Sequence, residues 1–258
     1  MSKKTSILIV LAVSVAMLVG CARYVIKTEK PQNIAELKRK IDELQNYNNG
    51  IDYFQGKAIV IYRKKQGDEE KVYSFLARVY SSPENNLRIN ISDFLLNKPV
   101  LSISVVSKSV TIVDHLHLRL IQKNMEEIDL SSFIELPLPL DFFMKSITGK
   151  VYIIGPEDYL LSGSTSILEI SNSKSKEIIY FNSDPLPARI ELIIEDRHII
   201  VSFEKRINES NSVPKKIVFT TGDESLEINY SQILVGECFE DSIFLMNDID
   251  TSRLKKVN

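Results

Sequence analysis

The chain has 258 residues, of which 44% are hydrophobic and 26% are charged, and its formal net charge is −2 at pH 7. This length can bury one substantial core, and the nine glycines and nine prolines are too few to suggest a string of linkers. No block of basic residues stands out, so the composition disfavours a nucleic-acid partner.

The first 20 residues have the pattern of a secretory signal. Lys3 and Lys4 give a positive start, and residues 7–19 are apolar apart from Ser14. Such a run is too short to cross a hydrocarbon core, which needs roughly 20 residues. The sequence therefore predicts a lipoprotein signal peptide over residues 1–20, followed by a lipid anchor and tether over residues 21–33.

The apolar run ends in the letters LVGC at residues 18–21, which resemble the lipobox of bacterial lipoproteins. The resemblance implies cleavage before Cys21 and acylation of this cysteine on its sulfur and its amine, which makes a durable membrane anchor. The alternative is a short membrane anchor with an incidental cysteine. Ala22 and Arg23 follow without an acidic residue, a context that resembles outer-membrane sorting in bacteria with two membranes. With Cys21 lipidated, Cys238 has no partner for an intrachain disulfide.

The next segment has the pattern of an amphipathic helix. Its apolar residues recur at spacings of three and four, and they are Ile34, Leu37, Ile41 and Leu44. Charged residues lie between them. Asn33 is a plausible N-cap and residues 48–50 (Asn-Asn-Gly) a plausible stop. We predict a helix of about four turns.

After this helix the hydrophobic period changes to two. Residues 87–92 (LRINIS) and 100–106 (VLSISVV) alternate cleanly, and strands follow one another at intervals of about ten residues. A second helix interrupts them within residues 136–150, since apolar residues recur there at helical spacing between Pro139 and Gly149. Strands are predicted to resume at residues 151–154 (VYII).

These patterns predict a mainly β (α+β) fold. Strands with one apolar and one polar face form a sheet that water wets on one side, and two amphipathic helices can pack on the other. We expect a curved antiparallel sheet of about eleven strands that forms an unclosed β-barrel lidded by helices. This domain is predicted to span residues 34–248, with residues 249–258 as a C-terminal tail.

The order of these features resembles the lipoprotein-localisation superfamily with the LolA/LolB fold, over roughly residues 34–245. The motifs that carry the resemblance are residues 54–58 (FQGKA) at the first strand and residues 136–149 (LPLPLDFFMKSITG) at the second helix. In that superfamily an unclosed β-barrel under helices holds the acyl chains of lipoproteins. The lipid-anchored receptor branch is the nearer match. The chain has no tryptophan, however, and residues 209–232 resemble uncharacterised lipid-anchored relatives.

Residues 92–99 (SDFLLNKP) join two alternating strands and carry the apolar residues Phe94, Leu95 and Leu96 where a turn should be polar. The resemblance implies a protruding loop that contacts the membrane and assists lipid transfer. The alternative is that these side chains fold back into the core, where the backbone groups of the loop would need hydrogen-bond partners.

The hollow of the half-barrel would be lined by apolar side chains of the strands and helices. The candidates are Phe75, Ile89, Ile91, Leu101, Ile103, Phe143, Met144, Ile147, Leu192 and Phe203. A ligand cavity and a packed core use the same residue types, so both interpretations stay open.

Histidines and acids show no convincing catalytic or metal site. His115, His117 and Arg119 share a predicted strand face beside Asp114, which could suggest a metal. The alternating leucines at positions 116, 118 and 120 would then take the buried face, and a solvated strand edge explains the pattern better. No nucleophile elbow, phosphate loop or zinc signature is present. We therefore expect no enzyme, no cofactor and no metal.

Together these features favour a lipid-anchored bacterial envelope protein, in the outer membrane and facing the periplasm. It would bind acyl chains or lipoproteins in its apolar half-barrel, for lipoprotein localisation or lipid handling. Its expected partners are the membrane, through acylated Cys21, its lipid cargo and a periplasmic carrier. The alternative is a structural lipoprotein with a filled core that binds another envelope protein.

Overall fold

The computed structural model describes residues 33–125, 128, 130, 136–154, 159–182, 186–206, 213–247, 249–250, 252 and 254–257. The chain divides into two units, residues 1–30 and 31–258, and all described residues belong to the second. The predicted signal peptide, the predicted acylation site Cys21 and the predicted tether up to residue 32 lie outside the described residues.

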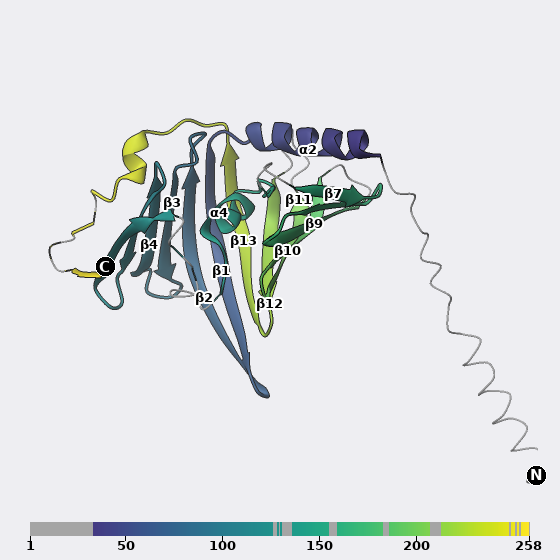
Figure 1. Cartoon of the computed structure of the whole chain (residues 1–258). Helices are drawn as coiled ribbons and strands as arrows, with labels where there is room; N and C mark the ends of the chain where they lie inside the picture. Colours follow the sequence, from purple (N-terminus) through teal and green to yellow (C-terminus); the bar gives the residue numbers. More distant parts are fainter. Residues whose placement is uncertain are drawn as a thin grey trace, which may run out of the picture. The chain divides into compact units, whose positions relative to one another are not determined.

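The described strands form one large sheet that curves into an unclosed half-barrel (Figure 1). Its first strands in chain order are β1 (Phe54–Gln66), β2 (Glu69–Ser81), β3 (Leu87–Asp93), β4 (Pro99–Val106), β5 (Ser109–Asp114), β6 (Arg119–Asn124) and β7 (Leu160–Gly163). The others are β8 (Ile167–Ser171), β9 (Ser175–Phe181), β10 (Pro187–Ile194), β11 (Arg197–Arg206), β12 (Pro214–Thr221), β13 (Glu224–Val235) and β14 (Lys255–Val257). The helices are α2 (Ile34–Asn49), α4 (Leu140–Ile147) and the 3-10 helix η2 (Asp241–Phe244).

The topology confirms the predicted fold class. Within the described residues the sheet has 14 strands in the order β14-β6-β5-β4-β3-β2-β1-β13-β12-β11-β10-β9-β8-β7. Neighbours pair antiparallel, as predicted, except for the short β14, which pairs parallel with β6. The sheet is larger than the expected eleven or so strands, partly because β7 and β14 add short strands at its two edges.

The strand predicted at residues 151–154 does not form. Side chains from distant segments satisfy its backbone instead: the Val151 N–H donates to Asn48 Oδ1 at 2.7 Å and the Ile154 N–H donates to Glu177 Oε2 at 3.0 Å. Asn48 Nδ2 in turn donates to the Val151 carbonyl oxygen at 2.7 Å. These bonds replace a strand ladder, and they attach the end of α2 to this segment.

Helix α2 begins at Ile34, where the sequence places it. The Asn33 side chain accepts a hydrogen bond from the Glu36 N–H at 2.9 Å, so it caps the helix as predicted. Leu37, Ile41 and Leu44 are buried, whereas Ile34 is exposed. Lys40 Nζ donates to the backbone oxygens of residues 164 and 165 at 3.0 and 2.7 Å, which ties α2 to the loop after β7.

Helix α4 lies against the concave face of the sheet (Figure 1). The Tyr230 hydroxyl on β13 donates to the Ile147 carbonyl oxygen at 2.6 Å, and the rings of Phe143 and Phe219 lie 5.4 Å apart. Gly149 follows the helix with φ +81°, and a Cβ there would lie 2.7 Å from the Pro214 ring. Only glycine fits this close turn, so the helix end is held tightly against the sheet.

The convex side of β3 and β4 is covered by the segment around η2. Arg88 and Ser104 are cross-strand partners, and Arg88 donates to the carbonyl oxygens of Ile243 and Leu245 at 3.1 and 2.8 Å. Ser104 donates to the Phe244 carbonyl oxygen. The inner side chains of the same strands face α4 instead. None of the described helices is both long and apolar enough to cross a bilayer.

Candidate functional site

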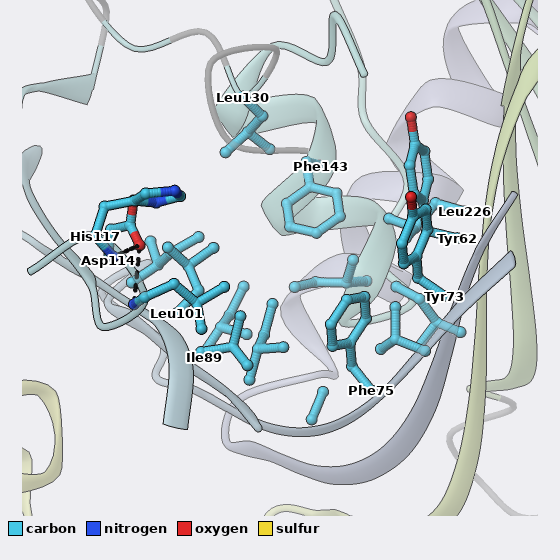
Figure 2. A pocket seen from close by; sticks show the side chains of 18 of the residues that line it. Tyr62, Tyr73, Phe75, Ile89, Leu101, Asp114, His117, Leu130, Phe143 and Leu226 are labelled. Atoms are coloured by element: carbon cyan, nitrogen blue, oxygen red, sulfur yellow. Dashed lines mark hydrogen bonds and ion pairs between the residues drawn. The ribbon is translucent and has the colours of Figure 1, made fainter. Parts of the chain in front are cut away.

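A cavity of about 350 Å³ lies between α4 and the concave face of β1–β6 and β13 (Figure 2). It is lined by Val60, Tyr62, Tyr73, Phe75, Ala77, Ile89, Ile91, Val100, Leu101, Ile103, Asp114, Leu116, His117, Arg119, Leu130, Phe143, Ile147, Leu226 and Ile228. Its wall is mainly aliphatic and aromatic, and its volume falls within the range of about 300–1,000 Å³ that small-molecule sites occupy.

Strand register explains why these residues converge. Ala58 pairs with Ala77, Ala77 with Ile91 and Ile91 with Leu101, so one row of small and branched side chains crosses the sheet on its concave face. The same row continues from Leu101 to Asp114. Directly opposite residues share a face of the sheet. The period-two pattern of each strand therefore produces one continuous apolar wall with a carboxylate at its end.

Seven of the ten predicted cavity residues line the cavity, and they are Phe75, Ile89, Ile91, Leu101, Ile103, Phe143 and Ile147. The other three are buried elsewhere. Met144 follows Phe143 on α4 without reaching the cavity, and Leu192 and Phe203 belong to β10 and β11, outside the strands that form it. The strand pattern could not separate Leu192 and Phe203 from the cavity residues, because strands in both parts of the sheet bury one face, and Met144 shares its helical spacing with Phe143 and Ile147.

The prediction missed several lining residues that the pattern contains. Tyr62 and Tyr73 are cross-strand partners on β1 and β2, and their rings stack with centroids 6.1 Å apart and an interplanar angle of 21°. They lie at one side of the cavity, as Figure 2 shows. The even-numbered alternation of β1 from Phe54 through Val60 was the signal for Tyr62, and the odd-numbered alternation of β2 through Phe75 and Ala77 was the signal for Tyr73.

Asp114 and His117 lie across the cavity from the two tyrosines (Figure 2), and Arg119, which also lines the cavity, is hydrogen bonded to Asp114. These three side chains form a polar group. We call this group the polar corner. Asp114 Oδ2 accepts hydrogen bonds from Arg119 Nε and Nη2 at 3.1 and 2.6 Å, and His117 Nδ1 lies 2.8 Å from the same oxygen. Burial alone would raise the pKa of Asp114, but the hydrogen bonds from Arg119 and His117 outweigh it and hold this pKa below its usual range. Asp114 is therefore a carboxylate with its partners in place.

The strand predicted through residues 116–118 is wrong. Residues 115–118 form a turn, in which Asp114 Oδ1 accepts from the Leu116 and His117 N–H groups at 3.1 and 3.0 Å. Leu116 and Leu118 are exposed rather than buried, and β6 begins only at Arg119. The aspartate side chain gives the backbone a local alternative to the strand ladder. His115 and His117 consequently point to different neighbours, since His115 Nε2 lies 3.0 Å from Ser102 Oγ.

The loop between β3 and β4 exposes the apolar residues that the sequence singles out. Leu95 and Leu96 are 86% and 68% exposed, and Phe94 is exposed as well. Asp93 Oδ1 accepts from the N–H groups of Leu95 and Leu96 at 2.9 and 2.7 Å, which satisfies the backbone without burial. These side chains do not fold back into the core.

This loop and the turn at 115–118 lie at the same end of the sheet. Pro99 pairs with Ser92 and Leu101 with Asp114, while the His115 N–H donates to the Val100 oxygen at 3.0 Å. Together they present an apolar rim, which consists of Phe94, Leu95, Leu96, Leu116 and Leu118. Leu116 also lines the cavity, so the apolar rim borders the cavity itself.

No protein-family model matches the sequence, and no curated protein matches it. Several solved structures share its fold. A proposed outer-membrane lipoprotein-sorting protein domain from Vibrio parahaemolyticus is 9% identical, with a TM-score of 0.60 over 84% of this chain and 99% of its own. A LolA superfamily protein from Nitrosomonas europaea is 15% identical, with a TM-score of 0.55 over 81% and 98%. A DUF1329 family protein from Desulfovibrio piger is 10% identical, with a TM-score of 0.58 over 84% and 99%. The chain therefore has the fold of the LolA superfamily, as the order of its elements predicts.

Proposed function

We propose that this protein holds an acyl chain in the cavity under α4, as a lipid-anchored protein for lipoprotein localisation or lipid handling in the bacterial envelope. The observation that carries the proposal is the apolar cavity of about 350 Å³. Apolar side chains line this space without filling it, whereas elsewhere in the sheet they pack against one another. The similarity of the fold to the lipoprotein-sorting domain from Vibrio parahaemolyticus supports it.

The apolar wall supplies the free energy of binding. Each methylene group moved from water into such a wall contributes about 0.8 kcal/mol, without any directional bond. Water gains little there, because aliphatic and aromatic side chains offer it no hydrogen bonds. Phe75 on the sheet and Phe143 on α4 face the cavity from different sides (Figure 2) and would hold a chain between them.

Release needs a competing apolar phase, which a membrane provides. The apolar rim would touch the bilayer beside the cavity and lower the cost of moving a chain between them. Acylated Cys21 would keep the protein at that membrane, which we propose to be the outer membrane on its periplasmic side, where a periplasmic carrier could deliver the cargo. In this mechanism no bond is made or broken, so no catalytic residue is required.

A second candidate is a structural lipoprotein whose apolar rim binds another envelope protein. The exposure of Leu95 and Leu96 favours it, since exposed apolar patches also mark protein interfaces. The two candidates differ in whether the cavity takes a ligand.

Binding of a fluorescent fatty acyl probe to residues 22–258 tests the proposal, since every described helix and strand belongs to the unit 31–258. Saturable binding is expected. Phe143→Asp should abolish it by placing a charge in the cavity, and Ala77→Phe should weaken it by filling the space. Leu95→Glu, on the rim, should leave it unchanged. Absence of binding by the folded wild-type protein would reject an acyl-binding function and favour the second candidate.

A further inference from the structure

The polar corner takes no part in holding an acyl chain, yet it lines the same cavity. We propose that it binds the anionic head of the ligand, and that the ligand is a single-chain lipid with a free carboxylate or phosphate. This inference rests on the proposed function, and it narrows the class of ligand.

The hydrogen bonds of the corner leave one nitrogen of Arg119, Nη1, with both of its N–H groups available. Asp114 Oδ2 accepts from Nε and Nη2 of Arg119, which fixes the guanidinium plane. Among the described residues Arg119 Nη1 has no hydrogen-bond partner. A neutral His117 that donates through Nδ1 to Asp114 has an acceptor at its other nitrogen, so it orients the carboxylate rather than binding an anion. Arg119 is therefore the residue of the corner that can donate to an anionic group.

The local charge also favours an anion. Asp114 and Arg119 compensate each other, but Lys255 of β14 pairs in register with Arg119. The Lys255 N–H donates to the Leu118 carbonyl oxygen at 2.8 Å, and its side chain is exposed. Because partners in register share a face of the sheet, a second cation lies beside Arg119. Asp93, in the neighbouring loop, accepts backbone N–H groups and does not line the cavity.

The cavity wall is apolar along most of its length and charged at one end. The apolar row that crosses the sheet through Ile91 and Leu101 ends at Asp114, and Arg119 is the next residue in register. An amphiphile whose chain lies along this row would place its head beside Arg119. The cavity volume, about 350 Å³, is near the lower limit for small-molecule sites and suits one chain better than several.

This geometry predicts that a free lipid with an anionic head binds more tightly than an acyl chain in an uncharged amide or ester. A fatty acid or a lysophosphatidate carries a negative charge at the head of its chain, where Arg119 could bind it. Lys255 does not line the cavity, but it adds to the positive charge beside Arg119. An acyl chain in an amide or ester has only a neutral carbonyl there, which can accept a hydrogen bond from Arg119 but cannot form an ion pair with it. The structure thus favours an anionic single-chain lipid over the acyl groups of a lipoprotein.

The test compares three ligands of equal chain length: palmitate, palmitoyl lysophosphatidate and methyl palmitate. Each displaces a neutral pyrene-labelled acyl ester from residues 22–258. At least one of the two anions should bind about fivefold or more tightly than the ester, as one charge-assisted hydrogen bond predicts. A preference for palmitate alone would identify a carboxylate head, and a preference for the lysophosphatidate alone would identify a phosphate head.

Arg119→Met should remove most of the difference in affinity between the anion and methyl palmitate and leave the affinity for the ester unchanged. Because this change leaves Asp114 without its partner, the double variant Asp114→Asn/Arg119→Met repeats it with the charges balanced. Lys255→Met should give a smaller loss of affinity for the anion than Arg119→Met. Arg39→Met on α2 is the control, since Arg39 pairs with Glu43 outside the cavity.

Equal affinity of wild-type protein for all three ligands would overturn this inference and leave the proposed acyl-binding function standing. An equal loss for ester and anions in both Arg119 variants would overturn it as well. Failure of the folded protein to bind any of the ligands would instead reject the proposed function, and this inference with it.

Discussion

Two parts of one sheet bury their concave face in different ways. In β1–β6 the inner side chains border a cavity of about 350 Å³. In β8–β11 a row of four residues crosses the sheet from Leu168 through Ile179 and Ile190 to Val201, and all of them are fully buried. We call these the hollow part and the packed part.

The difference comes from what covers each part. The packed part is closed by α2 and by residues 151–154, which are tied to each other and to β9 by the side chains of Asn48 and Glu177. A smaller hollow of about 200 Å³ there borders Ile170, but Asn48 and Lys145 make it more polar. The hollow part is covered mainly by α4, whose Phe143 and Ile147 reach the cavity. The same strand pattern therefore gives a core or a site, depending on its cover.

Two carboxyl groups show the same contrast. Glu177 lies between Ile170 and Leu192 in the packed part and is 0% exposed. Burial raises its pKa to about 8, although the Ile154 N–H donates to one oxygen, and the other oxygen has no hydrogen-bond partner among the described residues. Asp114, at the edge of the hollow part, has a lowered pKa because Arg119 and His117 outweigh its burial. The hydrogen bonds in the hollow part stabilise the charged form of Asp114, whereas burial in the packed part disfavours the charged form of Glu177.

Truncation of matched leucines should give the largest effect on stability. Leu192 in the packed part is 1% exposed, and Leu101 in the hollow part is 8% exposed. Leu192→Ala should lower the free energy of unfolding by about 2–5 kcal/mol, since it creates a new cavity among close neighbours. Leu101→Ala should cost about half as much, because one side of Leu101 already faces empty space. Urea unfolding measures both, and equal losses would mean that the cavity is closed in solution.

The second largest effect should be a pH dependence of the free energy of unfolding, which arises from Glu177. Its pKa is about 8 in the folded protein against an ordinary 4.5, so between these values the folded state holds a proton that the unfolded state has released. The free energy of unfolding should therefore fall as the pH rises, by about 2 kcal/mol between pH 6 and pH 8. Glu177→Gln should flatten this slope, while Glu169→Gln, which removes a surface ion pair with Lys176, should keep it. A wild-type slope in Glu177→Gln would assign the pH dependence to other groups.

The sequence was sufficient for the fold because the fold depends on local patterns. Alternation within each strand, the cap at Asn33 and the apolar spacing of the two helices are each readable within a few residues. They lead to a helix-lidded half-barrel, and they place Leu95 and Leu96 in an apolar loop, where the structure has them. The likeness to LolA superfamily structures agrees with that expectation.

The site was less predictable because it depends on distant contacts. Leu101 and Leu192 occupy equivalent places in their strand patterns, and only the positions of α4 and α2 make one a cavity residue and the other core. The alternation HLHLRL at residues 115–120 favoured a strand for a different reason: the contact that prevents the strand is local, since the Asp114 side chain accepts the N–H groups of Leu116 and His117, but the alternation outweighed this turn signal. Residues 151–154 have the composition of a strand, but side chains from residues 48 and 177 take their hydrogen bonds. No window of local sequence around residues 151–154 contains these partners.

Asp114→Asn, which removes the charge of this side chain, should change the free energy of unfolding less than the pH change that titrates Glu177. Asn at this position keeps an acceptor for the N–H groups of Leu116 and His117 but loses the charge-assisted bonds from Arg119. We expect a loss of about 1 kcal/mol in the free energy of unfolding at pH 7. Since the folded pKa of Asp114 is lowered, its contribution is present above the ordinary value of 3.8 and is lost as the pH falls through the folded pKa. Unfolding at neutral and acidic pH measures this, and a loss independent of pH would contradict it.

The smallest effect on stability should come from the apolar rim, where Leu95→Glu changes a side chain that is 86% exposed. The free energy of unfolding should shift by no more than about 0.5 kcal/mol. Leu160→Glu is a matched control, because Leu160 is 76% exposed but lies on β7, at the edge of the sheet beyond the packed part. If the rim contacts lipid, Leu95→Glu should lower binding to neutral phospholipid vesicles about tenfold, as the loss of one leucine from an apolar phase predicts. Leu160→Glu carries the same charge and should bind like wild type. Equal binding by both variants would show that the apolar rim does not contact the membrane. A protein partner would then be the remaining explanation for its exposed leucines.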